Sequence, residues 1–267
     1  MSVISKWNDL GPRVMSAVVM LLVGGTAIWL GGLPFHLLVS VVTGLMVWEL
    51  VRILGPKEQG APMWLGLLAA VVMFATVFLP PFARLPVLLA PVLAGMSSIS
   101  TGTKGSRVIW CAYAAVIVLA CYSALSLRGG HGLFWLAWLA AVVIMSDVAG
   151  YFAGRSLGGP KFWPKISPKK TWSGTIAGWI GAALVGVWFM LNSPAGPSLI
   201  ALSVLTAFAA QMGDIAESAI KRRYGIKDSS NLIPGHGGFL DRFDGFLGAL
   251  LLVLIAGQVL GFLPEVR

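Results

Sequence analysis

Long apolar segments separated by short polar ones dominate this sequence. Apolar stretches bounded by Gly, Pro or charged residues occur nine times. Most have the length of about 17 to 25 residues that an α-helix needs to cross a bilayer. The pattern predicts an all-α, polytopic integral membrane protein with about nine transmembrane helices. The predicted spans are residues 14–30, 35–54, 63–79, 85–99, 108–127, 133–154, 175–191, 198–220 and 243–263.

The composition agrees with this pattern. Of 267 residues, 57% are hydrophobic and only 11% are charged, against about 25% charged in an ordinary soluble domain. This balance excludes a soluble globular enzyme, a disordered protein and a disulfide-stapled secreted module. Cys111 and Cys121 lie ten residues apart in one apolar run, which on a helix separates them by about 15 Å. No disulfide or zinc cluster is expected.

The basic residues are unequally distributed between the two sides of this topology. With nine spans, sixteen of the 19 Lys and Arg residues fall on the side that holds the N-terminus. Because cytoplasmic loops are enriched in Lys and Arg, the N-terminus is predicted to be cytoplasmic and the C-terminus to lie on the opposite side. We divide the chain into N-terminal helices (1–105) and a region (106–267) that carries the two longest polar segments, the predicted cytoplasmic loops 155–174 and 221–242.

Six of the ten acidic residues lie in or beside those two loops. Asp147 interrupts an apolar helix, where a carboxylate must be paired, hydrated or bound to a cation. A structural hydrogen bond and a proton-relay acid are the alternatives. The eighth span carries four polar or charged residues at i, i+3, i+4 and i+7 spacing, which places them on one face of the helix. This stripe is either a neutralised structural cluster or a set of metal ligands with a phosphate-binding lysine beside it. Its members are Asp214, Glu217, Ser218 and Lys221.

A glycine-rich turn precedes the ninth span. Residues 234–238 contain one proline and three glycines, a backbone able to approach a ligand and to present N–H groups to an anion. Asp241 and Asp244 follow at i, i+3 spacing, where helix capping and the helix dipole are the simpler explanation. His236 in the turn is a candidate for proton transfer or phosphate contact, or an ordinary loop histidine.

Two other sets of charged residues can be explained by structural roles without any catalytic function. The 155–174 loop contains five basic residues, among them Lys169 and Lys170, which could simply hold anionic headgroups. Glu49 lies inside the second span one turn from Arg52, so a helix-end ion pair or a snorkelling group is the expectation there.

Carboxylates beside basic loops indicate metal-assisted phosphoryl or nucleotidyl transfer at the cytoplasmic membrane surface. Mg²⁺ prefers hard oxygen ligands and usually binds one or two carboxylates together with substrate phosphates. Lys and Arg side chains would neutralise a polyphosphate. The net charge of +9 therefore suits a polyphosphate at the membrane surface, and no nucleic acid is expected as a partner.

Four motifs resemble the phosphatidate cytidylyltransferases, also called CDP-diacylglycerol synthases. The longest runs from Ser218 to Asp244 and contains the glycine-rich turn. The others are residues 146–155, residues 167–172, and the pair of segments 211–214 and 217–218. The resemblance is strong over about residues 110–263. After Lys170-Thr171-Trp172 many members have Glu where this chain has Ser173, so no role is carried over to that position.

The resemblance implies a reaction and a set of site residues. CTP and phosphatidate would give CDP-diacylglycerol and pyrophosphate, with Mg²⁺, in phospholipid biosynthesis at the inner face of a bacterial plasma membrane. It also implies a homodimer and a second, monovalent cation. Carried over by motif position, the metal or catalytic carboxylates are Asp147, Asp214, Asp241 and Asp244. The predicted catalytic residues are Asp214, Lys221, Asp241, Asp244 and His236, and the predicted substrate contacts are Lys169, Lys170, Ser218, Arg222, Lys227, Gly237, Gly238 and Arg242.

Other functions fit parts of the pattern. A different CTP-dependent membrane lipid transferase or a polyprenol kinase would share apolar helices and acidic helix ends. An ion-coupled transporter would use Asp147 and Asp214 to bind its coupling ion, although charges in transporters are expected near the bilayer midplane.

Overall fold

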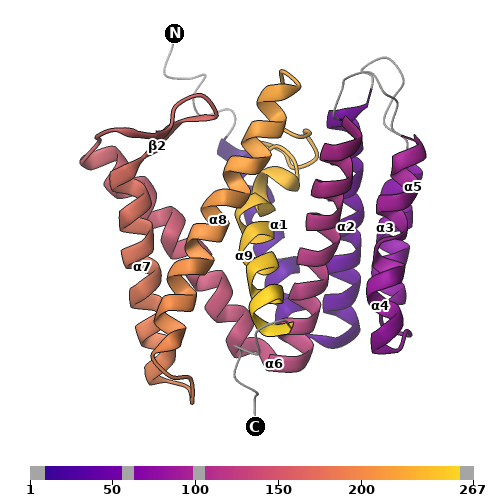
Figure 1. The fold of residues 1–267 in the computed structure, drawn as a ribbon, viewed down its shortest axis with the longest axis horizontal. Coiled ribbons are helices and arrows are strands. Elements are labelled where there is room, and N and C mark those ends of the chain that lie inside the picture. Colours follow the sequence, from indigo (N-terminus) through magenta and orange to yellow (C-terminus); the bar gives the residue numbers. More distant parts are fainter. Residues whose placement is uncertain (1–9, 56–62, 99–105, 259–267) are drawn as a thin grey trace. The chain divides into compact units, whose positions relative to one another are not determined.

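The structure, a computed structural model, describes residues 10–55, 63–98 and 106–258. Within these residues the chain is built of helices joined by loops, with one short hairpin (Figure 1). The helices are α1 (Leu10–Leu30), α2 (Gly32–Leu54), α3 (Met63–Ala75), α4 (Pro81–Leu88), α5 (Ala90–Ser98), α6 (Ser106–Ser156), α7 (Trp172–Leu191), α8 (Ser198–Arg223) and α9 (Leu240–Gln258).

Five of these helices are long and apolar enough to cross a bilayer: α1 from Gly11, α2, α6, α7 and α8. The chain is therefore a membrane protein, as predicted, but the count of nine spans is not confirmed. The third predicted span is represented by α3, whose 13 residues extend for about 20 Å. Pro86 lies inside α4, and α5 begins at Ala90, so the fourth predicted span consists of two short helices.

The fifth and sixth predicted spans occur together in α6. Its 51 residues contain a non-helical joint at Gly132, with φ 83° and ψ −176°. Positive φ is tolerated by glycine because it has no Cβ. The joint divides α6 into two helical parts that correspond to the two predicted spans.

The predicted loop 155–174 contains the hairpin. Strands β1 (Lys161–Trp163) and β2 (Ser167–Thr171) pair antiparallel, with Lys161 opposite Thr171. Thr171 is also the N-cap of α7, because its side-chain oxygen accepts from the Gly174 amide at 3.2 Å.

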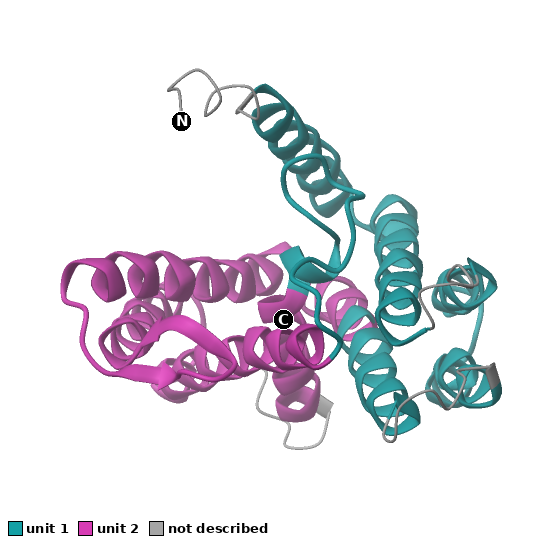
Figure 2. Cartoon of the chain, turned by 90° about the horizontal axis from the view of Figure 1, so that it is seen from above, with its two compact units in different colours: residues 1–121, 224–243 teal, residues 122–223, 244–267 magenta. Residues whose placement is uncertain are grey.

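The chain divides into two compact units, coloured separately in Figure 2. The first unit comprises residues 1–121 and 224–243, and the second comprises residues 122–223 and 244–267. The predicted loop 221–242 thus falls mainly in the first unit. The division into 1–105 and 106–267 stays a prediction.

Small residues allow close helix packing in the first unit. Helix α2 packs against α3, and a Cβ on Gly66 would lie 2.6 Å from the Gly44 carbonyl oxygen. Such close contacts between small residues are typical of helices packed in membranes. Met46, Leu50 and Leu65 are buried in this core.

A buried amide connects three helices in the second unit. The Gln211 side chain on α8 accepts from Trp179 Nε1 on α7 at 3.1 Å. It donates to Ser146 Oγ on α6 at 3.3 Å and to the Thr175 carbonyl at 3.4 Å. Buried polar groups satisfied in this way fix helix register. Gln211 therefore fixes the part of α8 that carries Asp214.

Candidate active site

Three of the predicted metal-binding carboxylates come together in the second unit, on three helices. We call Asp147 on α6, Asp214 on α8 and Asp244 on α9 the acidic cluster. Each of the three interacts electrostatically with the other two. Like charges held this close repel one another, so the arrangement favours a bound cation or basic partners.

The backbone of α8 and α9 is close beside this cluster. A Cβ added to Gly213 would collide with the Asp244 carbonyl oxygen, and one added to Gly248 would collide with the Ala209 carbonyl. Glycines at these two positions therefore bring α8 and α9 within van der Waals contact. This packing places Asp214 and Asp244 close together.

Lys170 is the basic partner of the acidic cluster. Its Nζ lies 2.5 Å from Asp214 Oδ2, and it donates to the Gln211 carbonyl at 3.4 Å. The side chains of Lys170 and Asp214 are 24% and 33% exposed. Ser218 also donates to Asp214, at 3.3 Å to Oδ1. A partly exposed ion pair of this kind can exchange partners when a phosphate or a metal binds.

A second ion pair lies one turn further along α8. Lys221 Nζ is 2.6 Å from Glu217 Oε2, and the Glu217 side chain is 1% exposed. The sequence left open whether this stripe is a structural cluster or a ligand set. The structure shows a buried pair at the Glu217 end and a partly exposed pair at the Asp214 end, so the stripe has two different halves. Lys221 also interacts electrostatically with Asp244.

A cleft of about 370 Å³ lies beside the acidic cluster within the second unit. It is lined by Ser146, Asp147, Gly150, Tyr151, Gly154, Arg155, Lys169, Lys170, Thr171, Gly174, Thr175 and Gln211. Its charged side chains are one carboxylate and three cations, which is a suitable lining for an anionic substrate accompanied by a divalent metal.

The walls of the cleft are held by close contacts. A Cβ on Gly174 would lie 2.5 Å from the Gly150 carbonyl oxygen, so α7 and α6 meet without side chains between them. Arg155 donates to the Tyr151 hydroxyl at 2.6 Å and lies 5.9 Å from that ring's centroid. The contact orients Arg155, which lines the cleft. Ser173, where relatives were expected to have Glu, donates to the Gly158 carbonyl at 2.5 Å.

The remaining predicted substrate contacts in the second unit lie at the surface. Lys169 and Arg222 are exposed. In the first unit, Lys227 and Arg242 are exposed as well, and Arg242 Nε donates to the His236 carbonyl at 2.9 Å. Because these four side chains are exposed, an anion can reach them from the solvent side.

Helix α1 holds the glycine-rich turn in the first unit. Ser16 Oγ lies 2.8 Å from His236 Nδ1 and 3.0 Å from the Pro234 carbonyl. The amides of Gly237 and Gly238 donate inside the loop, to the Ile233 carbonyl and to Asp241 Oδ2. The predicted roles of His236, Gly237 and Gly238 towards substrate stay predictions.

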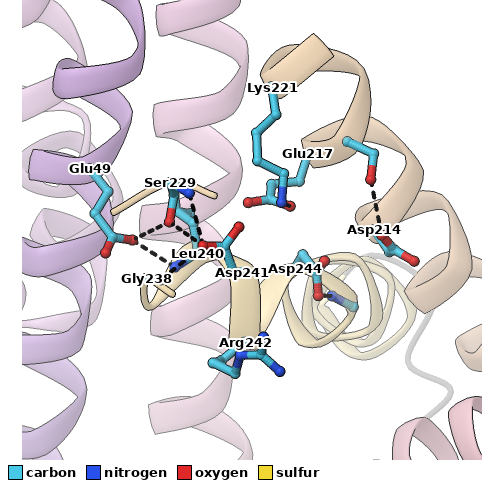
Figure 3. A network of polar contacts seen from close by, with 12 residues as sticks. Glu49, Asp214, Glu217, Lys221, Ser229, Gly238, Leu240, Asp241, Arg242 and Asp244 are labelled. Atoms are coloured by element: carbon cyan, nitrogen blue, oxygen red, sulfur yellow. Dashed lines mark hydrogen bonds and ion pairs between the residues drawn. The ribbon is translucent and has the colours of Figure 1, made fainter. Parts of the chain in front are cut away.

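Asp241 is bound to its own loop. Its Oδ2 accepts from the Ser229 amide at 2.8 Å, from Ser229 Oγ at 2.9 Å and from the Gly238 amide at 2.8 Å (Figure 3). The carboxylate thus closes the turn at the start of α9. Its predicted part in metal binding stays a prediction.

Glu49 has no ion pair with Arg52 among the described residues, contrary to that expectation. The carboxylate is fully buried and accepts from the Phe239 amide at 2.9 Å and the Leu240 amide at 2.7 Å. Arg52 instead lies 5.7 Å from the Trp48 ring centroid. The spacing to Arg52 suggested a local partner, whereas the true partners are about 190 residues away in sequence.

Within the described ranges, no group of three or more His, Cys, Asp or Glu side chains is arranged so that it could hold a metal ion. The acidic cluster nevertheless has the right donor chemistry, because Mg²⁺ prefers carboxylate oxygens and usually completes its coordination with water and substrate phosphates. The donor types in the acidic cluster are therefore those that a divalent cation prefers, and a metal at this cluster stays a prediction.

Comparison with known proteins identifies the family. A model of the cytidylyltransferase family matches residues 11–260. The chain belongs to the cytidylyltransferase family. Its relatives include proteins named phosphatidate cytidylyltransferase from Brucella suis, which is 35% identical over 94% of each chain, and from Pseudomonas aeruginosa, which is 33% identical over 89% of this chain and 93% of the relative.

A third relative with the same name, from Bacillus subtilis, is 31% identical over 90% of this chain and 94% of its own length. The family match at residues 11–260 reaches from α1 to α9, and each of the three relatives covers at least 89% of this chain, so membership is not limited to the motifs in the C-terminal half. They confirm the resemblance to the phosphatidate cytidylyltransferases.

Proposed function

We propose that this protein is a phosphatidate cytidylyltransferase that converts CTP and phosphatidate into CDP-diacylglycerol and pyrophosphate. Its membership in the cytidylyltransferase family and the three relatives of that name support the reaction. The structural observation that carries the proposal is the cleft beside the acidic cluster, in which Lys170 is paired with Asp214. A membrane-embedded fold suits a lipid substrate.

In the proposed reaction, a phosphate oxygen of phosphatidate attacks the α-phosphorus of CTP. The new P–O bond joins the lipid to cytidylate, the bond between the α-phosphorus and the bridging oxygen breaks, and pyrophosphate leaves with that electron pair. Phosphoryl-type transfers depend mainly on positioning and charge stabilisation. Lys169, Lys170 and Arg155 line the cleft, where they would bind and orient the phosphates.

Asp147, Asp214 and Asp244 are the proposed holders of Mg²⁺. When bound, the ion would neutralise phosphate charge and hold the triphosphate for in-line attack. Lys170 would exchange its ion pair with Asp214 for a substrate phosphate, and Asp214 would then be available as one of the residues that hold the ion. Partial exposure of both side chains leaves room for this exchange. The monovalent cation and Asp241 as a further ligand rest on the family resemblance.

The proposed location is the plasma membrane, with the N-terminus and the two polar loops on the cytoplasmic side. The excess of basic residues on one side supports this orientation, and CTP is a cytosolic substrate. The two ends of the chain lie outside the described residues. The homodimer is likewise proposed from the family resemblance.

Label transfer tests the proposal and separates it from its rivals. Purified protein would be incubated with phosphatidate and CTP labelled at either the α- or the γ-phosphate. Cytidylyl transfer puts the α-label into the lipid and the γ-label into pyrophosphate. A γ-label in the lipid would identify a kinase, and no label in the lipid with either CTP would contradict a lipid transferase acting on phosphatidate.

A further inference from the structure

The strongest unassigned feature is the buried carboxylate of Glu49 on α2. Its side chain is fully buried, and no ion pair to it occurs among the described residues. A buried carboxylate without hydrogen bonds or a counter-charge is costly. Four donors compensate it, and all four come from residues 229–240. Figure 3 labels two of the donor residues, Ser229 and Leu240.

The two backbone donors are at the start of α9. Phe239 precedes the first helical residue, Leu240, and its side chain cannot accept a hydrogen bond from the helix. Glu49 takes the place of a capping side chain, with one oxygen on each of the two amides. A carboxylate at a helix N-terminus also interacts favourably with the helix dipole.

The two hydroxyl donors come from the other end of the same loop. Ser230 Oγ donates to Glu49 Oε1 at 2.5 Å, and Ser229 Oγ lies 3.2 Å from Oε2. Ser229 has one hydroxyl hydrogen, which it shares between Glu49 and Asp241. Both serines are buried, at 3% and 4% exposure. One carboxylate therefore joins both ends of the segment 229–240.

The loop is packed tightly around this carboxylate. A Cβ added to Gly238 would collide with both Ser229 Oγ and Glu49 Oε1. The backbone thus passes against Glu49 with no room for a side chain. We call Glu49, Ser229, Ser230, Phe239 and Leu240 the Glu49 cluster.

We propose that Glu49 is a positioning residue, which holds the segment 229–240 and the N-terminus of α9 in the conformation needed for cytidylyl transfer. This rests on the proposed function. Glu49 acts on Asp241 through Ser229, whose amide and hydroxyl contact the Asp241 carboxylate. It acts on His236, which lies inside this segment, by fixing the backbone on both sides of it.

Glu49→Gln tests this role with little change of size. One carboxylate oxygen becomes an amide NH₂, which faces donors instead of accepting from them. A serine hydroxyl can rotate to accept from the NH₂, but the Phe239 or Leu240 amide cannot. We expect kcat/KM for CTP to fall by about 10- to 100-fold, as for other residues that orient a reactive group.

Ser40→Ala is the matched control. Ser40 is also buried on α2, but its hydroxyl donates to the His36 carbonyl of the same helix. The control is expected to keep the wild-type kcat/KM. An equal loss in both variants would overturn the proposal, because it would show a general effect of polar substitution in α2.

Hydrogen exchange gives a readout that does not depend on catalysis. In nanodiscs, Glu49→Gln should speed amide exchange in residues 229–240 and leave α7 and α8 unchanged. Unchanged exchange in residues 229–240 would overturn the role of Glu49. Absence of cytidylyl transfer by the wild type would instead overturn the proposed function, so the two failures are distinguishable.

A double-mutant cycle with Ser230→Ala separates positioning from general destabilisation. If both residues act through one contact, the loss of kcat/KM in the double variant is smaller than the product of the single losses. Multiplying losses would contradict the proposal. If Glu49→Gln does not fold, Ser230→Ala alone must show faster exchange in residues 229–240 and a lower kcat/KM, and a wild-type result would overturn the proposal.

Discussion

The acidic cluster and the Glu49 cluster compensate carboxylate charge in different ways. Asp214 in the acidic cluster is 33% exposed and is paired with a lysine that is itself partly exposed. Glu49 is fully buried and is compensated by two backbone amides and two hydroxyls. Backbone dipoles are fixed, whereas a lysine ammonium can move. The comparison indicates that the acidic cluster can exchange ligands during a reaction and that the Glu49 cluster stabilises one conformation.

Asp214→Asn should give the largest effect on activity. The substitution keeps the size of the side chain but removes the negative charge next to Lys170. We expect kcat/KM to fall by about 100- to 1,000-fold, the scale for loss of a preorganised electrostatic contact. Because partly exposed ion pairs contribute only about 0–1 kcal/mol, the thermal unfolding temperature should stay near that of the wild type.

Label transfer and a thermal-shift assay on the same Asp214→Asn preparation measure both quantities. A variant that unfolds at a much lower temperature while keeping its activity per folded molecule would reverse the comparison, because Asp214 would then be structural.

Gly238→Ala should have the next largest effect, on stability. The new methyl group has no room between Ser229 and Glu49, and overpacking of this kind costs about 1–3 kcal/mol. The unfolding temperature should fall. Gly129→Ala is the matched control, since its Cβ would meet nothing within 4 Å. Equal unfolding temperatures for both variants would show that the Glu49 cluster is loosely packed.

Tyr151→Phe should give the smallest effect. It removes the hydroxyl that accepts from Arg155 and keeps the ring against which the guanidinium rests. One hydrogen bond contributes about 0.5–1.5 kcal/mol, so the KM for one substrate should rise several-fold while kcat changes little. Substrate titrations check this. A fall in kcat at unchanged KM would place the contact in the chemical step.

Much of this fold could be predicted from the hydrophobic pattern, because helices in a bilayer require long apolar stretches. All nine predicted segments contain helix within the described residues. Which segments are long enough to cross a bilayer was less predictable, since prolines shorten α4 and α5 and a single glycine divides α6. The hairpin in 161–171 was also missed, because its strands have only three and five residues and show no alternation of apolar and polar positions.

The acidic cluster was predictable in composition and the Glu49 cluster was not. Asp147, Asp214 and Asp244 can be chosen as candidate site residues from the sequence, because acids are rare in apolar helices beside basic loops. Glu49 is also an acid in an apolar helix, but the nearby Arg52 suggests a local ion pair as the reason for its presence. Its actual partners are backbone amides and serines far away in sequence, and backbone donors leave no signal in the residue types.

The most direct test of the acidic cluster as the reaction site is the Mg²⁺ dependence of α-label transfer from CTP to phosphatidate by Asp244→Asn. Asp244 interacts with both other carboxylates of the cluster. We predict that wild-type transfer rises with Mg²⁺ and that the folded variant needs far more Mg²⁺ or stays inactive. Full activity of the folded variant at low Mg²⁺ would contradict the assignment of this cluster to metal and CTP.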